Sequence, residues 1–162
     1  MHETEAELDE IQTLLDSSLA RSTAHLQPIV VAGQRTLTAR QLADVITGMC
    51  TLSVATVTAA GEPRISGIDG HFLHGRWIFG TARSAAKARH LGARPAVSVA
   101  YLRGEELGVF THGVAEILNP VGEPEDQDWP SILEHLIKHY GESPLASSRG
   151  ESHPPALSEP CV

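Results

Sequence analysis

Residues 76–101, RWIFGTARSAAKARHLGARPAVSVAY, contain the pattern that decides the fold. Residues 77–79 favour a strand, because aromatic and β-branched side chains pack well on a pleated surface. Ser84 is a suitable N-cap, and the good helix formers of residues 85–91 follow it. Residues 97–99 are again β-branched at alternate positions. The stretch therefore predicts a strand, a tight turn, a short helix and a second strand.

The charge of this stretch differs from that of the whole chain. Residues 76–103 hold six basic residues of the chain's 12 and no acidic residue, although the formal net charge is −8. Lys87 is expected in the first helical turn, where a cation opposes the helix dipole by about 0.3–1 kcal/mol. A bound anion would reverse this effect, because free backbone N–H groups and Lys87 would both face it. We predict a phosphate site at Thr81, Ser84 and Lys87; the alternative is a solvated basic helix.

The composition limits the class of protein. A chain of 162 residues with 41% hydrophobic and 20% charged residues is typical of one globular domain. The negative net charge argues against a nucleic-acid partner and against an anionic membrane surface. The acidic N-terminus has no signal-peptide core, and the longest uncharged run, residues 45–61, is too short and polar to span a bilayer. We expect a cytoplasmic protein.

The remaining elements follow from local patterns. Apolar residues at three- and four-residue spacing predict a helix over residues 5–22, and a Thr38–Gln41 capping box predicts another over residues 39–47. Short turns separate the expected strands, which favours an antiparallel barrel. The other expected elements are an apolar arm at 27–32, strands at 52–58, 64–72 and 107–118, and a helix at 131–140.

Two features of the expected strands bear on the core and on ligand binding. The strand at 52–58 alternates imperfectly, with Leu52 and Val54 on one face and Ala55 and Val57 on the other, which predicts partial burial on both sides. Glycines 67 and 70 interrupt the next strand. They indicate either a close approach by a flat ligand or a bulge that curls the sheet.

The strand ending at Thr81, the Ala/Ser loop, K-x-R-x-L at 87–91 and x-P-x-V-S-V at 94–99 together resemble the pyridoxamine 5'-phosphate oxidase-like family. The similarity extends over about residues 37–118. It implies a mainly β fold with flanking helices, an antiparallel split β-barrel. Many members place a Ser two residues before the Lys, and this chain has Ala85 there, with Ser84 beside it.

The resemblance also implies a domain organisation. Residues 1–36 form an N-terminal helix and arm, and residues 37–142 form the barrel domain. Residues 143–162 are rich in Pro and Ser and show no periodicity, so we interpret them as a disordered or altered tail. The family's closing C-terminal strand has no counterpart there.

The family's function is expected to come with its fold. The resemblance implies an FMN-dependent oxidoreductase that acts on an unknown small molecule and works as a homodimer. The implied cofactor-binding residues are Arg64, Ser66, Ile68, Thr81, Ser84 and Lys87, and no catalytic acid or base is identified. The alternatives are a deazaflavin-dependent reductase, a non-catalytic flavin- or heme-binding protein, and a barrel without a ligand.

Other site chemistry is not indicated by the sequence. His135 and His139 would share one helix face, but no H-E-x-x-H motif or third ligand accompanies them, so no metal site is expected. Cys50 and Cys161 form neither a disulfide framework nor a metal motif. No G-x-S-x-G, phosphate-binding P-loop or dinucleotide fingerprint occurs.

Overall fold

The structure is a computed structural model that describes residues 2–120, 122 and 124–141. The chain divides into two compact units, the first ending at Ala115 and the second beginning at Glu116. The first unit holds α1 (Glu5–Ala20), α2 (Ala39–Val45), β1 (Cys50–Val57), β2 (Pro63–Leu73), β3 (Arg76–Phe79), α3 (Ala86–Ala93), β4 (Ala96–Arg103) and β5 (Leu107–Val114). The second holds α4 (Trp129–Tyr140).

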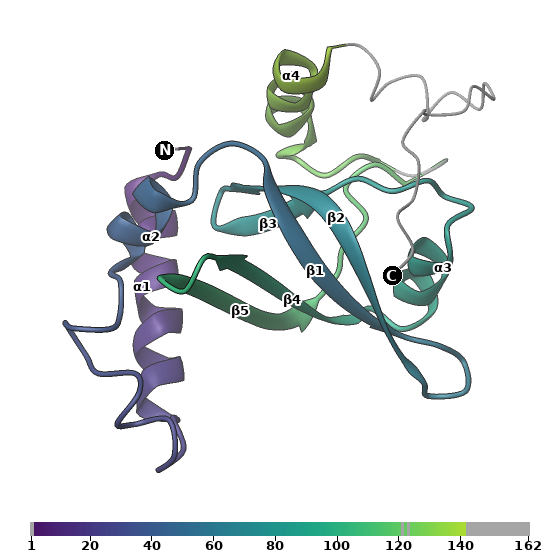
Figure 1. Cartoon of the computed structure of the whole chain (residues 1–162). Helices are drawn as coiled ribbons and strands as arrows, with labels where there is room; N and C mark the ends of the chain where they lie inside the picture. The colour runs from purple at the N-terminus through teal and green to yellow at the C-terminus, as the bar shows by residue number, and fades with distance from the viewer. Residues whose placement is uncertain (1, 121, 123, 142–162) are drawn as a thin grey trace. The chain divides into compact units, whose positions relative to one another are not determined.

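The five strands form one antiparallel sheet in the order β3-β2-β1-β4-β5, which Figure 1 shows strongly curled. In a flat sheet the two edge strands, β3 and β5, would lie about 19 Å apart, four spacings of about 4.8 Å. Instead, Trp77 Nε1 on β3 donates a hydrogen bond to Thr111 Oγ1 on β5 at 3.1 Å. The sheet therefore bends until side chains of its two edges meet, as in an incompletely closed barrel.

The core lies on one face of β1. Cys50, Leu52, Val54 and Thr56 are buried, whereas the alternate positions are exposed or half-buried. On the second face Ala55 is half-buried and Val57 is exposed, so the predicted partial burial of both sides is met at Ala55 and not at Val57. The regular alternation follows from the fold, because the inner face of a curled antiparallel sheet is closed while its outer face meets water.

Helices α1 and α2 pack against each other and contribute to the same core (Figure 1). Helix α2 begins with the predicted capping box of Thr38 and Gln41, and α1 begins with a capping box of Thr4 and Glu7 that was not predicted. The buried residues Leu8 and Ile11 of α1 join a cluster with apolar residues of α2 and the sheet. The apolar stripe of α1 therefore covers the barrel within one protomer.

The structure corrects several expected boundaries. Residues 24–29 form turns, and no strand occurs between 21 and 38, so the expected strand-like arm at 27–32 is wrong. Strand β5 ends at Val114, four residues before the predicted end, and α2 ends at Val45. The predicted tail, 143–162, lies outside the described residues.

The two glycines of β2 have different surroundings. The β1–β2 register is continuous from Cys50↔Gly70 to Val57↔Pro63, so neither glycine forms the bulge considered above. A Cβ at Gly70 would lie 2.4 Å from Leu52 Cδ1 and 3.1 Å from the Ile78 carbonyl oxygen. Position 70 therefore requires glycine, because the Leu52 side chain occupies the space where a Cβ would lie.

Candidate functional site

Helix α3 starts one residue later than the sequence suggested. Its N-cap is Ala85, so the prediction of a Ser84 cap is wrong. The Ala85 N–H donates to the Ala82 carbonyl at 2.9 Å, which closes a turn before the helix and leaves Ser84 exposed. The Ser84 carbonyl oxygen accepts a hydrogen bond from the Arg89 guanidinium. Its hydroxyl makes no capping bond.

The start of α3 is consequently uncapped. No side chain accepts a hydrogen bond from its first turn, although an α-helix leaves its first N–H groups without an intrahelical partner. Lys87 is the second residue of the helix. The free backbone N–H groups of the first turn and the nearby Lys87 ammonium give the N-terminus of α3 a positive potential, which favours a bound anion.

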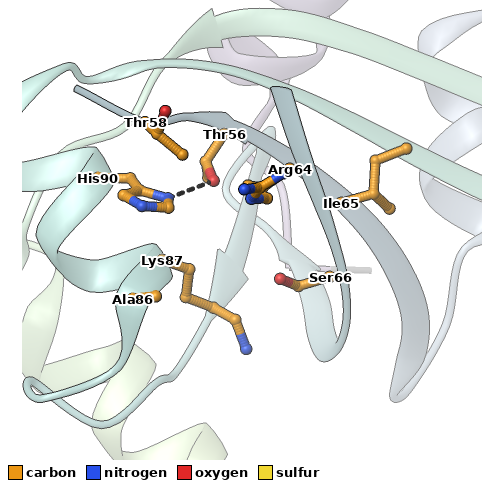
Figure 2. Close-up of a pocket in the computed structure, with 8 residues that line it drawn as sticks. All are labelled: Thr56, Thr58, Arg64, Ile65, Ser66, Ala86, Lys87 and His90. Carbon is orange, nitrogen blue, oxygen red and sulfur yellow. Dashed lines mark hydrogen bonds between the residues drawn. The ribbon is translucent and has the colours of Figure 1, made fainter. Parts of the chain in front are cut away.

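A cavity of about 360 Å³ lies between the start of α3 and strands β1 and β2 (Figure 2). Its volume falls within the range of small-molecule sites, roughly 300–1,000 Å³. Figure 2 shows the Lys87 side chain extending from α3 toward the side of Ser66. The lining residues are Thr56, Thr58, Arg64, Ile65, Ser66, Ala86, Lys87 and His90.

Strand pairing brings the β-sheet part of this lining together. Arg64 is paired with Thr56, and Ser66 with Val54. Directly paired residues of antiparallel strands share one face of the sheet, so Arg64 and Ser66 lie on the core side at the open end of the barrel. The Arg64 guanidinium also forms an exposed ion pair with Glu62, N to O 2.8 Å.

Three of the six predicted cofactor-binding residues line the cavity, namely Arg64, Ser66 and Lys87. Ile68 instead packs against the hydrophobic core. Thr81 and Ser84 precede α3 and do not line the cavity. The geometry therefore divides the predicted set, with two cationic residues and one serine at the cavity and the other three residues outside its lining.

Sequence reasoning missed three polar residues of the cavity, Thr56, Thr58 and His90. His90 Nδ1 lies 3.0 Å from Thr56 Oγ1. One local signal could have identified His90, because it follows Lys87 by three residues and so shares a helix face with it. The two threonines carried no such signal, since their role depends on where α3 docks.

The lining contains two cationic side chains and no carboxylate. Arg94 Nε donates to the Val57 carbonyl at 3.2 Å, which adds a second tie between α3 and β1. The cavity can therefore bind an anion held between the two strands and the helix.

Cys50 is not an alternative reactive centre. The side chain is 2% exposed. Burial raises the pKa of its thiol, and a hydrogen bond with Tyr101 only partly opposes this. A buried thiol with a raised pKa is a poor nucleophile.

The described part of the chain has neither a metal-ion site nor a membrane-spanning helix. No group of three or more His, Cys, Asp or Glu side chains there is placed to hold a metal ion. No helix among residues 2–120, 122 and 124–141 is long and apolar enough to cross a membrane.

The curled five-stranded antiparallel sheet with its flanking helices defines a split β-barrel protein, as the sequence predicted. The chain belongs to the pyridoxamine 5'-phosphate oxidase family, whose family model matches residues 38–156. A comparison with curated proteins finds no match.

Two solved structures are similar. The heme storage protein HutZ from Vibrio cholerae has a TM-score of 0.53 and 20% identity, over 76% of this chain and 82% of that one. The conserved hypothetical protein Rv2991 from Mycobacterium tuberculosis has a TM-score of 0.49 and 22% identity, over 65% of this chain and 78% of that one. At this identity HutZ supports the fold alone.

Proposed function

We propose that this protein binds FMN, with the phosphate in the cavity at the start of α3, and acts as an FMN-dependent oxidoreductase on a small molecule. One observation carries the proposal. The Lys87 ammonium lines a cavity beside the uncapped end of α3 and has no hydrogen bond or ion pair with any described residue. A half-buried lysine whose ammonium has no protein partner favours an anionic ligand.

The cavity residues have separate roles in this proposal. Lys87 and the first amides of α3 hold the phosphate, and Arg64 contributes the second positive charge. Ser66, on the adjacent strand, donates to the phosphate or the ribityl chain. Bound FMN supplies hydride and electron transfer, and the protein orients it and surrounds it with charge. The substrate then needs only alignment against the ring.

Isothermal titration with FMN and with riboflavin tests the proposal. Removing the Lys87 charge in Lys87→Met should weaken FMN binding by about 1.5–3 kcal/mol, as for a charge-assisted contact, which is roughly 10- to 150-fold in Kd. Riboflavin lacks the phosphate, so its affinity should not change. Lys138→Met, which alters the other lysine of the chain on α4, is the matched control and should bind FMN like wild type.

Equal FMN affinity of Lys87→Met and wild type would refute the phosphate assignment. Flavin activity is a further requirement: wild-type protein loaded with FMN must pass electrons from a reductant to an organic acceptor. Bound flavin that only oxygen reoxidises would remove the oxidoreductase part and leave a binding protein.

Absorbance spectra separate the other ligands. The fold shared with the heme storage protein HutZ makes a heme-binding role the second candidate. Bound heme would give a Soret band in the absorbance spectrum. A deazaflavin-dependent protein would instead be identified by titration, because it would bind a deazaflavin and not FMN. A cytoplasmic location stays a prediction, which fractionation of the producing cells tests.

We also propose that the protein is a homodimer formed through the outer face of its sheet. This face carries large exposed apolar side chains, among them Ile65 (75% exposed) and Phe110 (67% exposed). Small residues lie between them in the register, where Gly67 pairs with Ser53 and Ser53 with Ala100. Ala100 in turn pairs with Phe110.

The pattern suits a second copy of the same chain. A flat floor of small side chains next to a protruding aromatic ring can accept the same ring from a partner related by two-fold symmetry. None of the residues in this row is charged, and contiguous exposed apolar surface is typical of protein contacts. Sedimentation of the protein at micromolar concentration measures the predicted dimer.

A further inference from the structure

We propose that His90 is a further anion-binding residue of the cavity: Thr56 fixes its Nδ1, and its Nε2–H donates a hydrogen bond to the ligand's phosphate. The inference rests on the proposed function, because it places one more contact on the same phosphate. The two residues are 34 apart in the sequence. No motif links them, and the register of β1 and the docking of α3 bring them together.

The geometry leaves one imidazole nitrogen for a ligand. His90 Nδ1 lies 3.0 Å from Thr56 Oγ1, and Figure 2 shows this contact between α3 and β1. Thr56 is 3% exposed, so its hydroxyl has little access to water. His90 Nε2 has no hydrogen-bond partner among the described residues, although the side chain lines the cavity.

The direction of the Thr56 hydrogen bond decides what Nε2 can do. When the Thr56 hydroxyl donates to Nδ1, the proton of a neutral imidazole resides on Nε2. Nε2–H is then a donor and attracts a phosphate oxygen. In the other tautomer Nε2 presents a lone pair, which repels an anion. A bound phosphate therefore selects the tautomer in which Thr56 donates.

The charges around His90 favour the same arrangement. Thr56 on β1 and Thr58, just after β1, are uncharged, and β2 contributes Arg64, whose ion pair is with Glu62. Helix α3 contributes Lys87, and Arg94 follows it. With no carboxylate in the lining, an Nε2–H donor has no protein acceptor to compete with a phosphate. His90 also lies on the Lys87 face of α3, so both can reach one ligand group.

Two amide substitutions separate the two ring nitrogens. In His90→Gln the amide reaches the position of Nε2, and in His90→Asn it reaches only that of Nδ1. We expect His90→Gln to bind FMN within about threefold of wild type and His90→Asn to bind it about tenfold more weakly, as for loss of a hydrogen bond to a charged group. Riboflavin affinity should be the same for both variants, because riboflavin lacks the phosphate that Nε2–H contacts. A purely structural defect would instead weaken the binding of both ligands.

Three outcomes would overturn the inference: wild-type FMN affinity in His90→Asn, equal losses in His90→Asn and His90→Gln, or losses shared by riboflavin. A wild-type protein that does not bind FMN would refute the proposed function instead. The inference is then tested by long-range ¹⁵N–¹H spectra of the free protein, with the His90 signal assigned by its absence in His90→Gln. With saturating inorganic phosphate added, a proton on Nε2 supports the inference, and a proton on Nδ1 or an unchanged spectrum overturns it.

Discussion

Gly70→Ala should destabilise the protein, whereas Gly67→Ala on the same strand should not. A Cβ at Gly70 would meet Leu52 Cδ1 at 2.4 Å, closer than carbon atoms pack, and the Ile78 carbonyl oxygen at 3.1 Å. Leu52 cannot move aside freely, because it is 0% exposed. A Cβ at Gly67 has no atom within 4 Å. The two variants add the same methyl group to the same strand in opposite surroundings.

The expected magnitude follows from two terms. Overpacking a filled core costs about 1–3 kcal/mol. Replacing Gly by Ala at a compatible backbone position stabilises by about 0.4–1 kcal/mol through the unfolded chain. Gly70→Ala should therefore lower the free energy of unfolding by about 1–2 kcal/mol, which for a chain of this length lowers Tm by about 2–8 °C. Gly67→Ala should raise the free energy of unfolding of the protomer by about 0.4–1 kcal/mol, which is measured in the Phe110→Glu background because Gly67 lies in the proposed dimer interface.

Urea unfolding followed by fluorescence and circular dichroism measures both variants. Leu52→Ala alone should cost about 2.7–5 kcal/mol. Combined with Gly70→Ala it should cost less than the sum by about 0.5–1.5 kcal/mol, because the new methyl group occupies part of the vacated space. If Gly70→Ala were as stable as Gly67→Ala, or if the double variant were additive, the account of Gly70 as space for Leu52 would be wrong.

Two further predictions concern the dimer and the response to acid. Phe110→Glu should convert the proposed dimer to monomer in sedimentation, because it places a charge in the apolar interface. Its circular dichroism spectrum should match that of wild type, because Phe110 is exposed in the protomer. An unchanged dimer would contradict the outer-face interface. Partial burial raises the pKa of Glu7, but hydrogen bonds with Thr4 and His74 outweigh it and lower the pKa. The stability that Glu7 contributes is present above its unfolded pKa of about 4.3 and is lost as the pH falls through the lower folded pKa. Glu7→Gln lacks this titrating group. Its Tm should therefore fall less between pH 5 and pH 3 than the Tm of wild type.

Much of the fold could be predicted from the sequence, because its signals are local. The Thr4 and Thr38 caps, the Pro63 strand start and the turn at His74–Gly75 each depend on residues adjacent in the chain. The antiparallel order follows from short turns between strands. The missed details were also local, since Ala85 replaced Ser84 as the cap once residues 82–85 closed a turn.

The predicted residues that line the cavity came from two sources. The acid-free run of basic residues led to Lys87, and Arg64 and Ser66 came from the family resemblance. Ile68 was also predicted, yet its side chain packs on the core. It shares a face of β2 with Arg64 and Ser66 but lies farther along the strand, opposite Leu52, which is 0% exposed. Where along a barrel strand the core begins depends on pairing register and packing, which alternation alone left ambiguous.

The sequence by itself determined the family, the succession of strands and helices, and the one cluster of positive charge in an acidic chain. These depend on side-chain periodicity, turn chemistry and composition, which need no distant partner. Only the tertiary structure decided that the charge meets Thr56 and His90 in a cavity and that Leu52 lies over Gly70. Those contacts join residues far apart in the chain, and their positions follow from strand register, the curl of the sheet and the docking of α3, all of which are set by packing of the whole core.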